Sequence, residues 1–204
     1  MIKIHLKQKC KKIFPVMVRT HPGKGVFPMT NSKSYKKVYQ LVLASLFAAL
    51  TYVMTMVVQV PSPMQGYVNL GDCAVLLSAW LLGPLYGGAA AGIGSMLADL
   101  LSGYAHYAPG TFVIKLAMAV AAALIFRALQ SRASHNLLLS QAVSGVVAEA
   151  IMVVGYFGYA SLWLGKGLAA AASIPGNIVQ GVFGLVAAAA VYAVLNKSRV
   201  LARI

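Results

Sequence analysis

Long apolar runs, separated by short polar or glycine- and proline-rich breaks, cover most of the chain. The runs extend over about 38–60, 73–82, 86–101, 111–129, 137–164 and 177–195. Since about 20 apolar residues cross the hydrocarbon core of a bilayer as a helix, the pattern predicts an all-α integral membrane protein with six transmembrane helices. The second run is short and ends at Gly83-Pro84, a turn signal, so part of 61–71 is a candidate extension of it.

The composition supports a membrane protein and leaves no room for a soluble catalytic domain. Hydrophobic residues make up 60% of the chain and charged residues only 10%, and the mean hydropathy is +0.78. Soluble domains have about 45–50% apolar and about 25% charged residues. Two cysteines, Cys10 and Cys73, have no CxxC spacing and form no disulfide framework.

The basic residues lie in the N-terminal tail and in the short gaps between apolar runs, and the net charge is +14. Positive residues near the ends of spans stay in the cytoplasm. With six spans, one side collects Lys33, Lys36, Lys37, Arg127, Arg132, Lys197, Arg199 and Arg203. We therefore predict a multi-pass protein of a bacterial plasma membrane with both termini cytoplasmic, in contact with the lipid bilayer and not with nucleic acid.

Three segments are predicted: a basic tail at 1–37, a six-helix domain at 38–196 and a basic cytoplasmic tail at 197–204. Residues 1–28 carry seven of the 17 basic residues and have no signal-peptide pattern. Lys24-Gly25-Val26 can be encoded as AAA-GGA-GTN, which contains a ribosome-binding sequence shortly before Met29. We hypothesise that translation starts at Met29; a basic arm on the cytoplasmic membrane surface is the alternative.

Four ionisable residues fall within the predicted spans: Asp72, Asp99, Lys115 and Glu149. Such residues are costly in a bilayer and are candidates for function. Asp72, Asp99 and Lys115 are expected near the outer surface. Asp99 and Lys115 flank one short loop, so they are candidates for a structural ion pair or for ligand contact. Asp72 precedes an apolar run and is a candidate helix N-cap, with a structural role.

Glu149 lies in the middle of the fifth run with no basic residue near it in the sequence. Tyr156 and Tyr159 follow one or two turns further out, and Asn177 and Gln180 share one face at the start of the sixth run. A carboxylate, amides and aromatic rings that converge in an outward-facing bundle favour a small, flat solute with hydrogen-bonding groups. Hydrogen bonding between helices is the alternative.

The outer loop at 103–110 is rich in aromatic residues. Tyr104 and Tyr107 are expected in an aromatic belt at the membrane interface. His106 is a candidate for the belt or for a ligand pocket.

Small residues form two motifs in the chain. Gly88 and Gly92 form a GxxxG motif typical of helix packing. Ala44 and Ala48 form an AxxxA motif that fits internal packing or docking of a partner.

No enzyme motif is present in the sequence. The glycines and serine at 92–95 do not form GxSxG, and we find no phosphate-binding loop, no HExxH and no cysteine–histidine metal cluster. We predict that the chain is not an enzyme and needs neither a cofactor nor a metal.

Several segments together resemble a known family. VNLGDCAVLLSAWLLGPLYGG, GIGSMLADLLSGY and YAPGTFVIK, followed by EAIMVVGYFGY and ASIPGNIVQG, are similar to the S components of energy-coupling factor (ECF) vitamin transporters of the riboflavin type. The similarity covers about 38–195. It implies six membrane helices, capture of a micronutrient on the outer side, and a complex with a transmembrane coupling protein and two cytoplasmic ATPases. In that family an AxxxA on the first span contacts the coupling protein, and Ala44 and Ala48 match its position.

The residues leave the substrate open. A compact pocket with Glu149, Asn177 and Gln180 favours hydroxymethylpyrimidine, a thiamine precursor, or a pyridoxine-like vitamin; riboflavin is the second candidate, with Trp163, Tyr156 and Tyr159 available for stacking. His106 and Lys115 complete the set of expected substrate-binding residues. A stand-alone proton-coupled transporter that uses Glu149 is an alternative of another class, as is a purely structural membrane protein.

Overall fold

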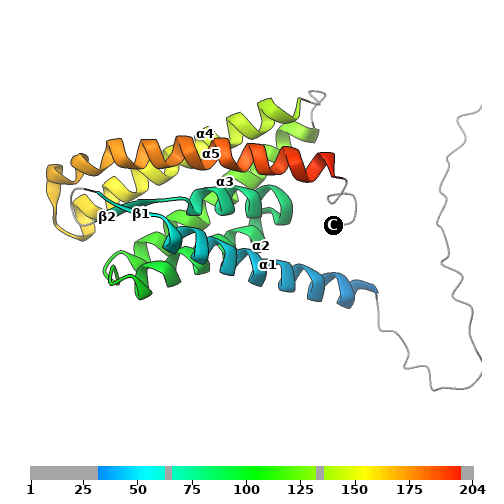
Figure 1. Ribbon diagram of the computed structural model, residues 1–204, viewed down its shortest axis with the longest axis horizontal. Helices are drawn as coiled ribbons and strands as arrows, with labels where there is room; N and C mark the ends of the chain where they lie inside the picture. The colour runs from blue at the N-terminus through cyan, green and yellow to red at the C-terminus, as the bar shows by residue number, and fades with distance from the viewer. Residues whose placement is uncertain (1–31, 63–65, 132–135, 199–204) are drawn as a thin grey trace, which may run out of the picture.

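The computed structural model describes residues 32–62, 66–131 and 136–198, which form a bundle of apolar helices with a small β-hairpin at one end (Figure 1). The proposed start at Met29 and the basic residues Arg132, Arg199 and Arg203 lie outside the described residues. In chain order the elements are α1 (Ser32–Val57), β1 (Gln59–Ser62), β2 (Gly66–Asn69), α2 (Gly71–Leu101), α3 (Ala108–Ser131), α4 (Leu137–Gly158), the π-helix η1 (Tyr159–Trp163), the 3-10 helix η2 (Gly167–Ser173) and α5 (Ile174–Lys197).

Five helical stretches in the described part of the chain are long and apolar enough to cross a membrane. The protein is therefore an all-α membrane protein, as the apolar runs predict. The second and third predicted runs both lie within α2, which consists of two helices joined at a kink.

A kink at Gly83 divides α2 into two segments that fold back on each other. Gly83 has φ 84° and ψ −171°, far from helical values, and Pro84 follows it. The Ser78 hydroxyl donates to the Gly87 carbonyl at 3.2 Å, although nine residues of straight helix would separate the two by about 13.5 Å. The turn signal read at Gly83-Pro84 is thus confirmed, and the chain reverses direction there.

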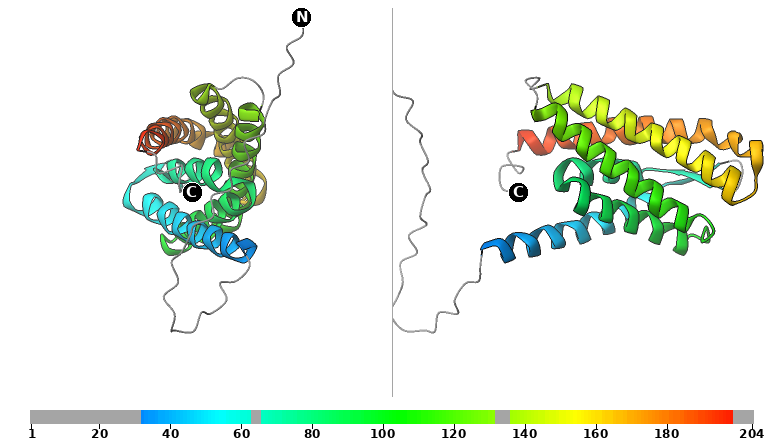
Figure 2. Two further views of the ribbon diagram at one scale, coloured as in Figure 1. Left: turned by 90° about the vertical axis from the view of Figure 1, so that its right-hand side faces the viewer. Right: turned by 180° about the vertical axis from the view of Figure 1, so that it is seen from behind.

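The first segment of α2, residues 71–82, lies in the centre of the bundle. Figure 2 shows it end-on between α1 and α5, and all but one of its residues are buried. Figure 1 shows that the start of α1 and the end of α5 lie at the same end of the bundle, opposite the hairpin. An even number of passes along the bundle produces this arrangement.

The apolar core at the end away from the hairpin is built around Trp80. Its ring lies 5.8 Å from the Phe126 ring and 5.9 Å from the Tyr192 ring, measured between centroids. The indole Nε1 donates to the Ser144 hydroxyl at 3.1 Å, which satisfies its one polar atom. These contacts join α2, α3, α4 and α5.

Small residues let the helices approach closely. A side chain at Gly92 would meet Phe112 of α3, and one at Gly94 would meet the Ala48 carbonyl of α1. Ala44 is buried in contact with Leu82 and Ala90. The GxxxG motif therefore serves internal packing. The AxxxA motif was a candidate for internal packing or for docking of a partner, and the structure shows internal packing for Ala44.

The segment between the first two apolar runs contains a two-stranded antiparallel hairpin. Gln59 pairs with Asn69, and Pro61 pairs with Tyr67. A two-stranded hairpin leaves one side of each strand without a partner strand, so Pro61 lies in an edge strand, where proline is tolerated.

The reversal at Gly83 gives a first prediction. Gly83→Ala should lower the free energy of unfolding by about 1 kcal/mol or more, because this backbone region is almost restricted to glycine. The new methyl group would also fall on the Arg127 guanidinium. The measurement is unfolding in mixed micelles. Gly158→Ala is the control: its backbone is helical, the space around it is open, and stability should not fall. Equal stability of both variants would contradict the strained turn.

Candidate functional site

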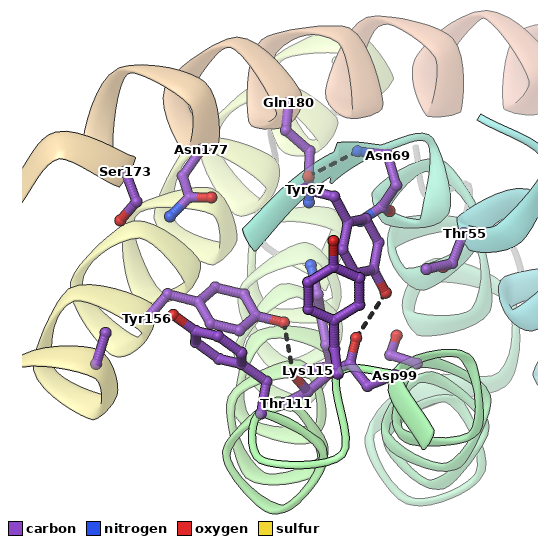
Figure 3. A pocket seen from close by; sticks show the side chains of 14 residues that line it. Thr55, Tyr67, Asn69, Asp99, Thr111, Lys115, Tyr156, Ser173, Asn177 and Gln180 are labelled. Atoms are coloured by element: carbon purple, nitrogen blue, oxygen red, sulfur yellow. Dashed lines mark hydrogen bonds between the residues drawn. The ribbon is translucent and has the colours of Figure 1, made fainter. Parts of the chain in front are cut away.

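A polar cavity opens beneath the hairpin, between α2, α3, α4 and α5. It holds about 650 Å³ of space not filled by protein atoms, its open mouth included. Figure 3 shows side chains from all these elements that point into it. The lining residues are Thr55, Tyr67, Asn69, Ser95, Asp99, Tyr104, Tyr107, Thr111, Lys115, Tyr156, Ala160, Ser173, Asn177 and Gln180.

A buried ion pair forms one wall of the cavity. Lys115 of α3 pairs with the Asp72 carboxylate of α2, and both side chains are almost completely buried. The Gln180 amide of α5 donates to the other Asp72 oxygen at 2.6 Å, and its carbonyl accepts from the Asn69 backbone at 2.9 Å. One chain of polar contacts thus connects the hairpin with three helices.

Asp99 lies on a second wall and is held by the hairpin. The Tyr67 hydroxyl donates to Asp99 Oδ1 at 2.6 Å, a distance typical of a bond to a charged acceptor. Burial first, and then the neighbouring carboxylate, raise the pKa of the Tyr67 phenol well above its ordinary value. Tyr67 therefore remains a hydrogen-bond donor at any physiological pH.

Aromatic rings surround Asp99 and the centre of the cavity. The Tyr67 and Tyr104 rings lie 4.8 Å apart between centroids, and the Tyr107 and Tyr156 rings lie 6.5 Å apart. The Tyr156 hydroxyl donates to Thr111 at 3.1 Å. Four tyrosines in one cavity offer flat faces for a ring, together with hydroxyl groups that form hydrogen bonds.

Comparison with known proteins decides the family. The model of the family "ECF-type riboflavin transporter, S component" matches residues 35–197. The chain belongs to this family of S components. It is therefore a transport protein and not an enzyme.

Two further proteins are similar to this S component. A Pyrococcus woesei protein described as "Uncharacterized protein in gap 3'region" is 38% identical over 149 residues, which cover 71% of this chain and 93% of the relative. The solved structure titled "Structure and mechanism of the S component of a bacterial ECF transporter" has a TM-score of 0.61 and 21% identity. The match covers 79% of this chain and 97% of that chain, and it supports the fold.

Four of the residues that the sequence analysis expected in the site of the S component line the cavity. They are Lys115, Tyr156, Asn177 and Gln180. Tyr159 does not line it; its hydroxyl donates to the His106 carbonyl at 2.9 Å and ties η1 to the loop before α3. His106 itself is exposed. The four lining residues therefore remain the candidates for contact with substrate.

Glu149 is the main disagreement with the expected site. It is buried on α4, close enough to Asp72 and Lys115 for electrostatic interaction, but it packs against Gly181 of α5 and does not line the cavity. Neither carboxylate oxygen has a hydrogen-bond partner. The position of Glu149 within an apolar run correctly predicted a buried ionisable residue. It did not predict the direction in which the side chain points.

The structure also corrects three roles. Lys115 pairs with Asp72 and not with Asp99. Asp72 is not a helix N-cap, because α2 begins at Gly71, whose backbone amide donates to the Asn69 side chain at 2.8 Å. Tyr104 and Tyr107 line the cavity and are not confined to an aromatic belt.

Sequence reasoning did not select several lining residues, among them Thr55, Tyr67, Asn69, Ser95, Thr111 and Ser173. Ser95 and Asp99 are four residues apart and therefore share a helix face, a signal that was available. The hairpin residues had no such signal. Among the described residues, no three His, Cys, Asp or Glu side chains are grouped to hold a metal ion.

Proposed function

We propose that this S component captures riboflavin, or a vitamin with a similarly flat polar ring, in the cavity beneath the hairpin. The observation that carries the proposal is the match of residues 35–197 to the riboflavin-type family, combined with a polar cavity that contains four tyrosines. Tyrosine faces stack on a flat ring, and the amides and hydroxyls suit its polar edge and a hydroxylated side chain.

Riboflavin is better supported than hydroxymethylpyrimidine or a pyridoxine-like vitamin. The smaller substrates were favoured for a compact pocket centred on Glu149, and this residue does not line the cavity. The stand-alone proton-coupled transporter also loses its main support, since Glu149 was its candidate proton site. Uptake by the chain alone in liposomes under a proton gradient would restore it.

In the proposed complex the S component crosses the membrane six times, with residues 71–82 and 84–101 counted as two crossings and with both termini in the cytoplasm. The reversal at Gly83 and the shared end of the two termini favour this topology. A coupling protein and two ATPases would drive uptake. Reconstitution with such an energising module should give uptake that depends on ATP.

Asn177→Ala gives a direct test of the site. Its amide points into the cavity from α5 (Figure 3), and loss of a neutral hydrogen bond should weaken riboflavin binding by about 2- to 10-fold. Calorimetry on the protein in detergent, with riboflavin, hydroxymethylpyrimidine and pyridoxine, measures this.

Asn136→Ala is the matched control. Asn136 caps α4 by accepting from the Leu139 amide at 3.3 Å, away from the cavity, so this change should leave the affinity unaltered. Tight binding of hydroxymethylpyrimidine without binding of riboflavin would refute riboflavin as the substrate. No binding of any of the three compounds would contradict vitamin capture at this site.

A further inference from the structure

Two polar atoms of α2 at the cavity have no partner in the protein. Asp99 is 5% exposed and Ser95 is 3% exposed, both line the cavity, and neither Asp99 Oδ2 nor the Ser95 hydroxyl makes a hydrogen bond. Buried polar atoms in native proteins are nearly always paired. Because the two residues lie one helical turn apart on the same face, they present an acceptor and a hydroxyl side by side.

The surrounding groups do not satisfy Asp99 Oδ2. Tyr67 donates to the other oxygen, Oδ1. Thr111 lies close to the carboxylate and interacts with it, but no hydrogen bond joins it to Oδ2. The Lys115 ammonium is paired with Asp72. Within the described cavity, Asp99 Oδ2 is thus an acceptor without a partner, and the N–H of a ligand can satisfy it.

The cavity has two sides. Asp99 accepts from Tyr67, whose ring is tilted against the Tyr104 ring, whereas Ser173 of η2 and Asn177 of α5 lie on the opposite side in Figure 3, with Tyr156. The Tyr67 and Tyr104 rings beside Asp99 offer an aromatic surface on which a flat ring can pack. A ring packed there presents its edge to Asp99.

We propose that Ser95 and Asp99 recognise a ring edge on which an N–H adjoins a carbonyl or ring-nitrogen acceptor. Asp99 Oδ2 accepts from the N–H, the Ser95 hydroxyl donates to the adjacent acceptor, and the side chain of the ligand extends toward Ser173 and Asn177. This inference rests on the proposed function and specifies the substrate as a flat lactam- or imide-type ring. The imide edge of riboflavin has this pattern.

The test measures the affinity of the full chain in detergent for riboflavin and for N3-methylriboflavin. In the second compound a methyl group replaces the hydrogen of the ring N–H. The parent should bind riboflavin at least about 10-fold more tightly than the methylated compound, because hydrogen bonds to charged groups correspond to about 10- to 100-fold in affinity. Asp99→Asn should weaken riboflavin binding by a similar factor and reduce the difference between the two compounds to about 2-fold or less.

Two further variants separate recognition from folding. Ser95→Ala should weaken riboflavin binding by about 2- to 10-fold, and it tests the same ring edge should Asp99→Asn fail to fold. Tyr67→Phe removes the bond to Asp99 Oδ1 but keeps the carboxylate. It should therefore preserve the preference for riboflavin over the methylated compound.

The outcomes distinguish this inference from the proposed function. If the parent binds riboflavin but Asp99→Asn and Ser95→Ala bind it equally well, the ring-edge inference is wrong and the capture function stands. If the parent binds both flavins equally, the N–H contact is likewise refuted. If the parent binds no flavin, both proposals fail.

Discussion

Lys115→Met will lower the free energy of unfolding by about 3–5 kcal/mol, the largest loss that we expect from a single substitution in this chain. Methionine keeps the length and the apolar contacts of the lysine stem but removes the ammonium. Asp72, which is 0% exposed, is then a buried carboxylate with Gln180 as its remaining side-chain partner. The desolvation cost of the charge is no longer offset by an ion pair. Unfolding in mixed micelles without ligand measures the change.

The double variant Asp72→Asn with Lys115→Met is the control for this prediction. Both charges are absent, so no unpaired ion is buried, and the double variant should be more stable than Lys115→Met alone. Replacement of a whole buried pair is often close to neutral. A double variant whose loss equals the sum of the two single losses would show that the residues do not interact, and a loss below about 1 kcal/mol for Lys115→Met would contradict the pairing.

Glu149→Met should give the largest gain in stability, about 1–3 kcal/mol, because a buried polar group without hydrogen bonds is replaced by an apolar side chain of similar size. Both Glu149 oxygens lack partners, and the side chain packs against Gly181. Riboflavin affinity should not change, since Glu149 does not line the cavity. Thermal unfolding and calorimetry in detergent measure the two effects.

Glu149→Gln is the matched control, because the amide remains polar and has the same surroundings. Its gain in stability should be clearly smaller than that of Glu149→Met. A loss of affinity of 10-fold or more in either variant would place Glu149 at the ligand, as its position in the sequence suggested, and would contradict a location outside the site.

The apolar runs were sufficient to predict the helices, because the cost of placing unpaired backbone groups in lipid leaves few alternatives. The run at 137–164 became α4 and η1, and the turn signal at Gly83-Pro84 marks the reversal within α2. These features depend on local composition and on the backbone preferences of single residues, which can be read from the chain itself.

The contacts that form the site depend on residues far apart in the sequence. Gln180 meets Asp72 across 108 positions, and Tyr67 meets Asp99 across 32. The short loop between Asp99 and Lys115 suggested that these two residues pair, but the fold-back of α2 brings Asp72 to Lys115 instead. Likewise, the composition of an aromatic loop cannot distinguish tyrosines that face lipid from those that turn inward.

The shortness of the first segment of α2 determines where the cavity lies relative to the lipid. Twelve residues, 71–82, extend about 18 Å, whereas the hydrocarbon core is about 30 Å thick. If the segment reaches one surface of the membrane, its other end stops about 12 Å short of the opposite one, and the hairpin descends into the bundle to meet it. Backbone outside helices is tolerated at such depth only where protein or a cavity surrounds it. A captured molecule would therefore sit below the level of the lipid headgroups and would have shed its water shell before any transport step begins.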